Sequence, residues 1–144
     1  MTALDQLVRL HSWNLDEKRQ KLAELERFRT KLLGNIDTLE AELEREQATA
    51  ERSEVTTISL PAFIKATIDR RRKIEGSIAE IDRSIAIARD EIGQAFQEFK
   101  KYETAHGNHQ RREALKQSRR EQVAADEMGI ELHRRQAAAG SGHS

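Results

Sequence analysis

Apolar residues recur at spacings of three and four along residues 2–50, and they keep one heptad frame throughout. Ten of the fourteen a and d positions of this frame are apolar. Position a falls at Val8, Leu15, Leu22, Arg29, Ile36, Leu43 and Ala50, and position d at Leu4, His11, Lys18, Leu25, Leu32, Leu39 and Glu46. An uninterrupted repeat of about 3.5 residues is typical of a long helix that packs along one seam against another helix. We therefore predict a first coiled-coil arm over residues 2–50, with Thr2 and Asp5 forming a capping box at its start.

A second stretch, residues 60–106, keeps a heptad frame of its own. Ten of its thirteen a and d positions are apolar. Position a falls at Ile64, Arg71, Ile78, Ile85, Ile92, Phe99 and His106, and position d at Thr67, Ile74, Ile81, Ala88, Ala95 and Tyr102. The glycines Gly34, Gly76 and Gly93 fall outside both seams, where each costs about 1 kcal/mol of helix propensity without opening the core. The pattern predicts a second coiled-coil arm over residues 60–106.

The residues between the two arms predict a bend. Residues 55–58 are Val, Thr, Thr and Ile, whose β-branched side chains disfavour helix. Ser59 is a suitable cap for the next helix. Pro61, the chain's single proline, is tolerated in the first turn of a helix, where its missing N–H has no partner to lose. We therefore place the bend at residues 51–59 and expect the chain to turn back on itself there.

A chain that folds back at this bend has a defined register. The residue numbers of facing positions should add up to about 110 when two helices run antiparallel from such a bend. Leu4 then faces His106, where the second apolar stripe ends. Arg29 lies near Asp82 and Arg71 near Glu40, so two charged a positions can reach acids on the other arm. The predicted fold is all-α: a long antiparallel two-helix coiled-coil hairpin, with an intermolecular coiled coil of extended chains as the alternative.

The remainder of the chain has no partner arm. Residues 107–136 keep a helical composition with only scattered apolar residues, so we predict an overhanging C-terminal helix. Residues 137–144, "AAAGSGHS", are small and glycine-rich, and are predicted to be a disordered tail.

Composition narrows the class of protein. Of 144 residues, 37% are hydrophobic and 35% charged, which is too little apolar material for a thick globular core. Lys and Arg together number 25, as do Asp and Glu, so no net charge favours nucleic acid or an anionic membrane as partner. There is no cysteine and no run of roughly 18 apolar residues that could span a membrane. We expect a cytoplasmic protein that is a monomer in isolation.

The sequence offers little catalytic or ligand-binding chemistry. His106 and His109 are spaced to share a metal on a helix, but no cysteine or acid completes the set, so we expect no metal and no cofactor. No phosphate-binding loop or nucleophile motif occurs, and an enzyme is not expected. The basic segments 69–75 and 109–121 are interrupted by acids and lack stacking aromatics, so nucleic-acid binding is not expected either.

The bend carries an apolar cluster that is a candidate partner surface. Ile58, Leu60, Phe63 and Ile64 gather where the helices have little left to pack against, and exposed apolar clusters mark binding sites. The alternative is that these four side chains only plug the end of the hairpin. The predicted overhanging helix is a second candidate surface.

Three segments carry a resemblance to a known family. They are "LPAFI" (residues 60–64), "AFQEFKKYE" (residues 95–103) and "ADEMGIELHRRQ" (residues 125–136). With the hairpin pattern, they resemble the FliJ family of bacterial flagellar export proteins over roughly residues 4–135, and more remotely the stalk proteins of injectisome secretion systems. The more distinctive matches are Phe63, Ile64, Phe99, Lys100, Lys101, Glu103, Asp126 and Glu127.

The resemblance implies a non-enzymatic stalk or chaperone-like component of the flagellar type III export apparatus, similar in shape to the central shaft of rotary ATPases. Members of that family associate with the hexameric export ATPase and its regulator and connect them to the membrane export gate; export substrates or their chaperones are further candidate partners. The implied location is the cytoplasm, at the inner membrane through the export apparatus. Carried over to this chain, the bend would face the gate, and the ATPase would contact Arg112, Arg119, Arg120, Arg134 and Arg135. A generic coiled-coil scaffold or tether, and a nucleic-acid-binding helical arm, are the competing interpretations.

Overall fold

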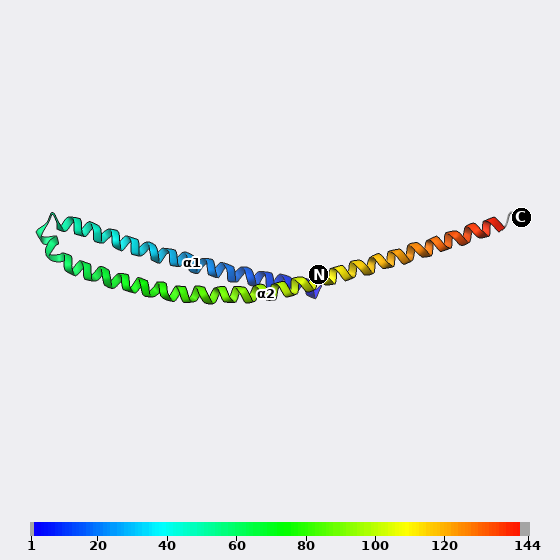
Figure 1. Cartoon of the computed structure of the whole chain (residues 1–144), viewed down its shortest axis with the longest axis horizontal. Helices are drawn as coiled ribbons and strands as arrows, with labels where there is room; N and C mark the ends of the chain where they lie inside the picture. Colours follow the sequence, from blue (N-terminus) through cyan, green and yellow to red (C-terminus); the bar gives the residue numbers. More distant parts are fainter. Residues whose placement is uncertain (1, 142–144) are drawn as a thin grey trace. The chain divides into compact units, whose positions relative to one another are not determined.

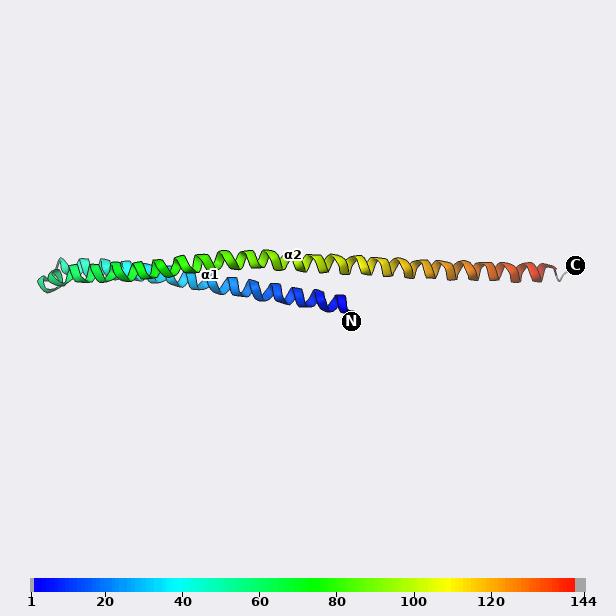
Figure 2. The ribbon, with the colours of Figure 1, turned by 90° about the horizontal axis from the view of Figure 1, so that it is seen from below.

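The computed structural model describes residues 2–141, which form two helices and no strand. Helix α1 spans Ala3–Ala50 and helix α2 spans Glu54–Ser141. In residues Leu10–Phe99 the two helices lie side by side and run in opposite directions, as both views show (Figure 1, Figure 2). The predicted all-α antiparallel hairpin is confirmed.

The core of the Leu10–Phe99 unit is a single seam between α1 and α2. Leu15 and Ala88 are among its most buried side chains, with 3% and 5% of their surface exposed. Every buried residue in the described part of the chain falls on a predicted a or d position: Leu15, Leu32, Ile36, Leu39, Ala50, Thr67, Ile85, Ala88 and Ala95. Gly34, Gly76 and Gly93 lie off this seam, with open space where a Cβ would stand. The two heptad frames therefore identify the buried residues correctly.

Ion pairs across the seam confirm the predicted register. Arg29 Nε donates to Asp82 Oδ1 at 2.6 Å, and Arg71 Nη1 donates to Glu40 Oε1 at 2.6 Å. In both pairs the two side chains are half exposed to water. Exposed pairs of this kind contribute about 0 to 1 kcal/mol each, whereas a polar residue at a seam position can fix the alignment of two helices. These pairs serve register more than stability.

The bend is shorter than predicted and comprises residues 51–53 only, because Ser53 rather than Ser59 caps α2. Ser53 Oγ accepts a hydrogen bond from the Thr56 N–H at 3.5 Å, and the Ser53 carbonyl accepts one from the Thr57 N–H at 3.0 Å. Ser59 lies inside the helix, where its hydroxyl donates to the Thr56 carbonyl at 3.1 Å. A cap six residues earlier starts the helix before the β-branched residues 55–58, whose helix propensity is too weakly unfavourable to prevent it.

Pro61 lies inside α2 rather than in its first turn, which corrects a second detail. Its ring removes the N–H that would bind the Thr57 carbonyl. The turns before it are held in other ways, because the Thr57 hydroxyl is within hydrogen-bond distance of the Ala50 carbonyl (2.5 Å) and the Ser53 carbonyl (2.9 Å). The contact with Ala50 ties the start of α2 to the end of α1.

The second unit comprises Met1–Arg9 and Lys100–Ser144. The predicted capping box is present: the Asp5 N–H donates to Thr2 Oγ1 at 3.2 Å, and the Thr2 N–H donates to Asp5 Oδ2 at 2.9 Å. Hydrogen bonds from Thr2, and then the His106 ring, hold the pKa of the Asp5 carboxyl below its usual value. His106 Nε2 contacts Asp5 Oδ1, so α2 meets the first turn of α1 at the place that the register predicts.

Helix α2 continues to Ser141, so the prediction of a disordered tail is wrong for residues 137–141. Residues 137–139 are alanines, the strongest helix formers, and they extend the helix past the last charged residue. Residues 142–144 of the predicted tail lie outside the described residues. Neither described helix is apolar enough over a long enough run to cross a membrane.

Candidate partner-binding surfaces

The apolar side chains at the bend differ in how far they are exposed. Ile58 is 82% exposed, whereas Leu60, Phe63 and Ile64 are half buried. Ile64 occupies a seam position, so the predicted four do not form one open patch. The arrangement brings one of them fully to the surface and leaves three partly covered by the hairpin's own packing.

The sequence interpretation missed Val55, which is 78% exposed. Val55, Ile58 and Ala62 follow one another at spacings of three and four and therefore share one side of α2. All three are exposed, and we call them the tip face. The spacing is visible in the sequence, but it places these residues on one side only if they belong to a helix. The predicted bend at residues 51–59 leaves Val55 and Ile58 outside any helix.

Hydrogen bonds hold the start of the helix that carries the tip face. Ser53 caps the helix that carries it, and the Thr57 hydroxyl joins that helix to the Ala50 carbonyl of α1. Glu51, Arg52 and Glu54 are exposed beside it and carry charges of both signs. The uncovered apolar groups, rather than a net charge, are therefore what this end of the hairpin presents to a partner.

The predicted basic residues of α2 all lie on exposed helix in the second unit. Arg135 pairs with Glu131 of its own helix at 3.4 Å. Within the residues that the structure describes, no ion pair forms at the other four: Arg112, Arg119, Arg120 and Arg134. Apolar side chains stand among them, with Leu115, Val123 and Ile130 each 56–57% exposed. The helix thus presents unpaired cations beside uncovered apolar groups.

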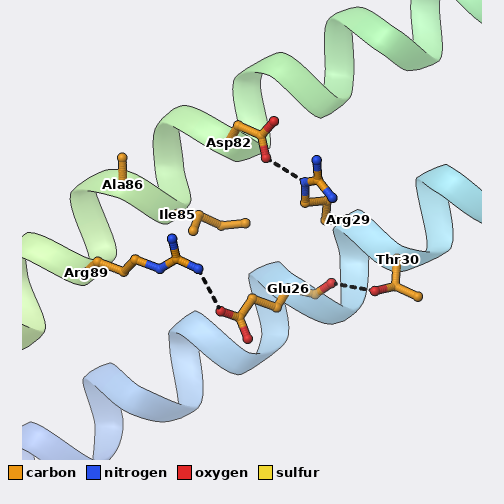
Figure 3. A pocket seen from close by; sticks show the side chains of 7 residues that line it. All are labelled: Glu26, Arg29, Thr30, Asp82, Ile85, Ala86 and Arg89. Atoms are coloured by element: carbon orange, nitrogen blue, oxygen red, sulfur yellow. Dashed lines mark hydrogen bonds and ion pairs between the residues drawn. The ribbon is translucent and has the colours of Figure 1, made fainter.

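A shallow groove runs along one side of the hairpin (Figure 3). It lies between α1 and α2 and is lined by Glu26, Arg29, Thr30, Asp82, Ile85, Ala86 and Arg89. Its charged groups already have partners, since Arg89 pairs with Glu26 at 3.5 Å and Arg29 with Asp82 at 2.6 Å. The Thr30 hydroxyl donates to the Glu26 carbonyl at 3.1 Å. The groove is a by-product of cross-helix pairing and presents no free acid, base or nucleophile.

The two histidines with metal-binding spacing have different surroundings. His106 contacts Asp5, and His109 is exposed on α2. Among residues 2–141, no group of three or more His, Cys, Asp or Glu side chains is arranged to hold a metal ion. The tip face and the exposed length of α2 are therefore the candidate partner-binding surfaces.

Comparison with known proteins finds a family whose model matches this sequence. The family model described as "Flagellar FliJ protein" matches residues 1–138, nearly the whole chain. No curated protein and no solved structure matches the sequence.

Proposed function

Because this chain belongs to the flagellar FliJ protein family, whose members are non-enzymatic components of the flagellar export apparatus, we propose that it links the export ATPase complex to the membrane export gate. It acts in the cytoplasm, held peripherally at the inner membrane by its partners. In dilute solution it is a monomer when not engaged, and export substrates or their chaperones are further partners that this role allows.

The observation that carries this proposal is the division of the molecule into a seam and two uncovered surfaces. The seam uses up the buried apolar residues, and its charged neighbours pair across the helices. Among residues 2–141, no enclosed site remains in which a carboxylate or a histidine could be desolvated for catalysis. What remains uncovered is the tip face in one unit and the helix beyond residue 109 in the other, which suits a protein that binds one partner through each.

The exposed part of α2 is the surface proposed for the ATPase complex, through Arg112, Arg119, Arg120, Arg134 and Arg135. Arginine is well suited to such contacts because its planar group can bind carboxylates in a bidentate manner. The tip is the surface proposed for the gate. Ile58 and Val55 would make the main contacts, with Leu60, Phe63 and Ile64 beneath or beside them.

Reversing the charge of Arg119 and Arg120 tests the ATPase assignment. We expect Arg119→Glu with Arg120→Glu to reduce copurification of the export ATPase from motile cells by about tenfold or more, because each lost charge pair at an interface costs roughly 1.5 kcal/mol or more. The gate protein should still be recovered at the normal level.

Arg70→Glu with Arg72→Glu is the matched control, since both arginines are exposed on α2 within the hairpin. This variant should bind the ATPase normally. Equal loss in the two variants would show that overall charge, and not the proposed surface, determines binding. Normal recovery of the ATPase by the Arg119 and Arg120 variant would contradict the proposal that this part of α2 binds the ATPase.

A further inference from the structure

The part of α2 from residue 109 to residue 135 is a long, exposed stretch of helix. Every residue from His109 to Gly140 is exposed, and α2 runs through this length as one continuous helix (yellow to red in Figure 1 and Figure 2). Helices in proteins obtain most of their stability from packing an apolar face against something else. We therefore expect an uncovered helix of this length to bind a partner.

One side of this helix combines apolar and charged residues in a regular order. Leu115, Arg119, Val123, Asp126 and Ile130 follow one another at spacings of four, four, three and four, which places them in one stripe along the helix. We call these five residues the terminal stripe. Its apolar members are more than half exposed. Arg119 and Asp126 form no ion pair within the described part of the chain.

Charges along this helix are segregated into two adjacent blocks. Residues 111–120 contain a single acid, Glu113, and five bases: Arg111, Arg112, Lys116, Arg119 and Arg120. Residues 121–131 contain no base and four acids: Glu121, Asp126, Glu127 and Glu131. The helix therefore carries a basic block followed by an acidic block of nearly equal length. Two copies of it that run antiparallel would place opposite charges next to each other.

We propose that the occupant of the terminal stripe is a second copy of this chain, paired antiparallel about a two-fold axis close to Gln122. In this arrangement the basic block of each copy lies along the acidic block of the other. Arg119 then faces Asp126 of the second copy, and Leu115 faces Ile130, with both contacts repeated by symmetry as in any isologous interface. Parallel pairing would align each block with itself and is opposed by like charges.

The proposed pairing is weak and depends on salt. The stripe offers only three apolar side chains per copy, and its ion pairs lie at the surface, where charges are screened over about 8 Å at physiological ionic strength. The paired form should therefore appear at high protein concentration and low ionic strength and dissociate on dilution. It also covers Arg119, so pairing would compete with the ATPase contact proposed above, although its own evidence does not depend on that contact.

Charge reversal in each block tests the proposal on the full chain by sedimentation velocity. Wild-type protein should associate into dimers in low salt and return to monomers in high salt. A basic-block variant (Arg112→Glu, Lys116→Glu and Arg119→Glu) should remain monomeric, as should an acidic-block variant (Asp126→Lys, Glu127→Lys and Glu131→Lys). An equimolar mixture of the two variants should form dimers again, because every block then meets its opposite charge. Wild-type protein that stays monomeric in low salt, or dimers that survive either reversal, would overturn the proposal.

Disulfide crosslinking through single introduced cysteines distinguishes antiparallel from parallel pairing. The sequence has no natural cysteine that could form other crosslinks. Gln122→Cys lies at the proposed axis and should crosslink to its own copy under oxidation. Leu115→Cys should not crosslink to itself, but it should crosslink when mixed with Ile130→Cys. Crosslinking of Leu115→Cys to itself would indicate parallel pairing and contradict the proposal, as would a Gln122→Cys chain that remains uncrosslinked in low salt.

Discussion

Replacing Ile85 by alanine is expected to lower the free energy of unfolding by about 2 to 4 kcal/mol, as for other large-to-small changes in a packed core. Ile85 lies at a seam position of α2 and is only 6% exposed. Its removal leaves a gap between two helices that have no further layer to close it. Urea unfolding followed by circular dichroism would measure the change.

Ile87 supplies the matched control, because it is the same residue type two positions away and is 60% exposed. Ile87→Ala should change the free energy of unfolding by no more than about 0.5 kcal/mol, as is usual for surface positions. If the two variants lost the same stability, the seam would not run where the heptad frame places it.

The second large effect is expected at the tip face. Val55→Asp with Ile58→Asp should weaken binding to the gate protein by about 3 kcal/mol, on the order of a hundredfold, because two apolar side chains lose their burial at the interface. Helicity should be unchanged, since acidic residues are favourable in the first turns of a helix. Affinity for the purified gate protein and spreading of cells in soft agar would both report the loss.

Two further variants make this result specific. Ile87→Asp places one acidic side chain on an exposed side of the hairpin away from the tip and should bind the gate normally. Phe63→Ala with Ile64→Ala changes half-buried side chains, one of them at a seam position, so it should lower stability as well as binding. Normal gate binding by the Val55 and Ile58 variant, with normal motility, would show that the tip face is not the contact.

The hairpin could be predicted in detail because its determinants repeat along the chain. Each heptad adds the same information about which residues are buried, so single exceptions such as Arg29 and Arg71 do not disturb the frame. Once both frames were known, the bend fixed the register, and the partners of these two arginines followed. The structure confirms both partners, Asp82 and Glu40.

The bend was predicted less well because it depends on a few local hydrogen bonds and not on a repeat. The β-branched residues 55–58 disfavour helix only weakly. Pro61 disfavours it more strongly, yet α2 includes it together with the long helix that follows. Ser53 supplies a cap, and the Thr57 hydroxyl reaches back to Ala50. These contacts move the start of α2 to Glu54, and with it Val55 joins the exposed apolar side of the helix.

The candidate surfaces were predictable only in part. Apolar residues near the bend and basic residues on α2 were visible in the sequence, but their exposure depends on the helix boundaries and on which side of the helix each residue occupies. Ile64 illustrates the difference, since the same residue that suits a partner also belongs to the seam. Which of these side chains a partner uses depends on the shape of a surface that this chain does not contain.

The claim on which the account depends is that α1 and α2 pair within one molecule, and a crosslink between Arg29→Cys and Asp82→Cys tests it most directly. The parent side chains are in contact across the seam at 2.6 Å, and the chain has no other cysteine. In dilute solution, a short bifunctional maleimide should join the two cysteines efficiently and give a product with the mass of one chain. A crosslinked product containing two chains, or the absence of any crosslink, would contradict the hairpin.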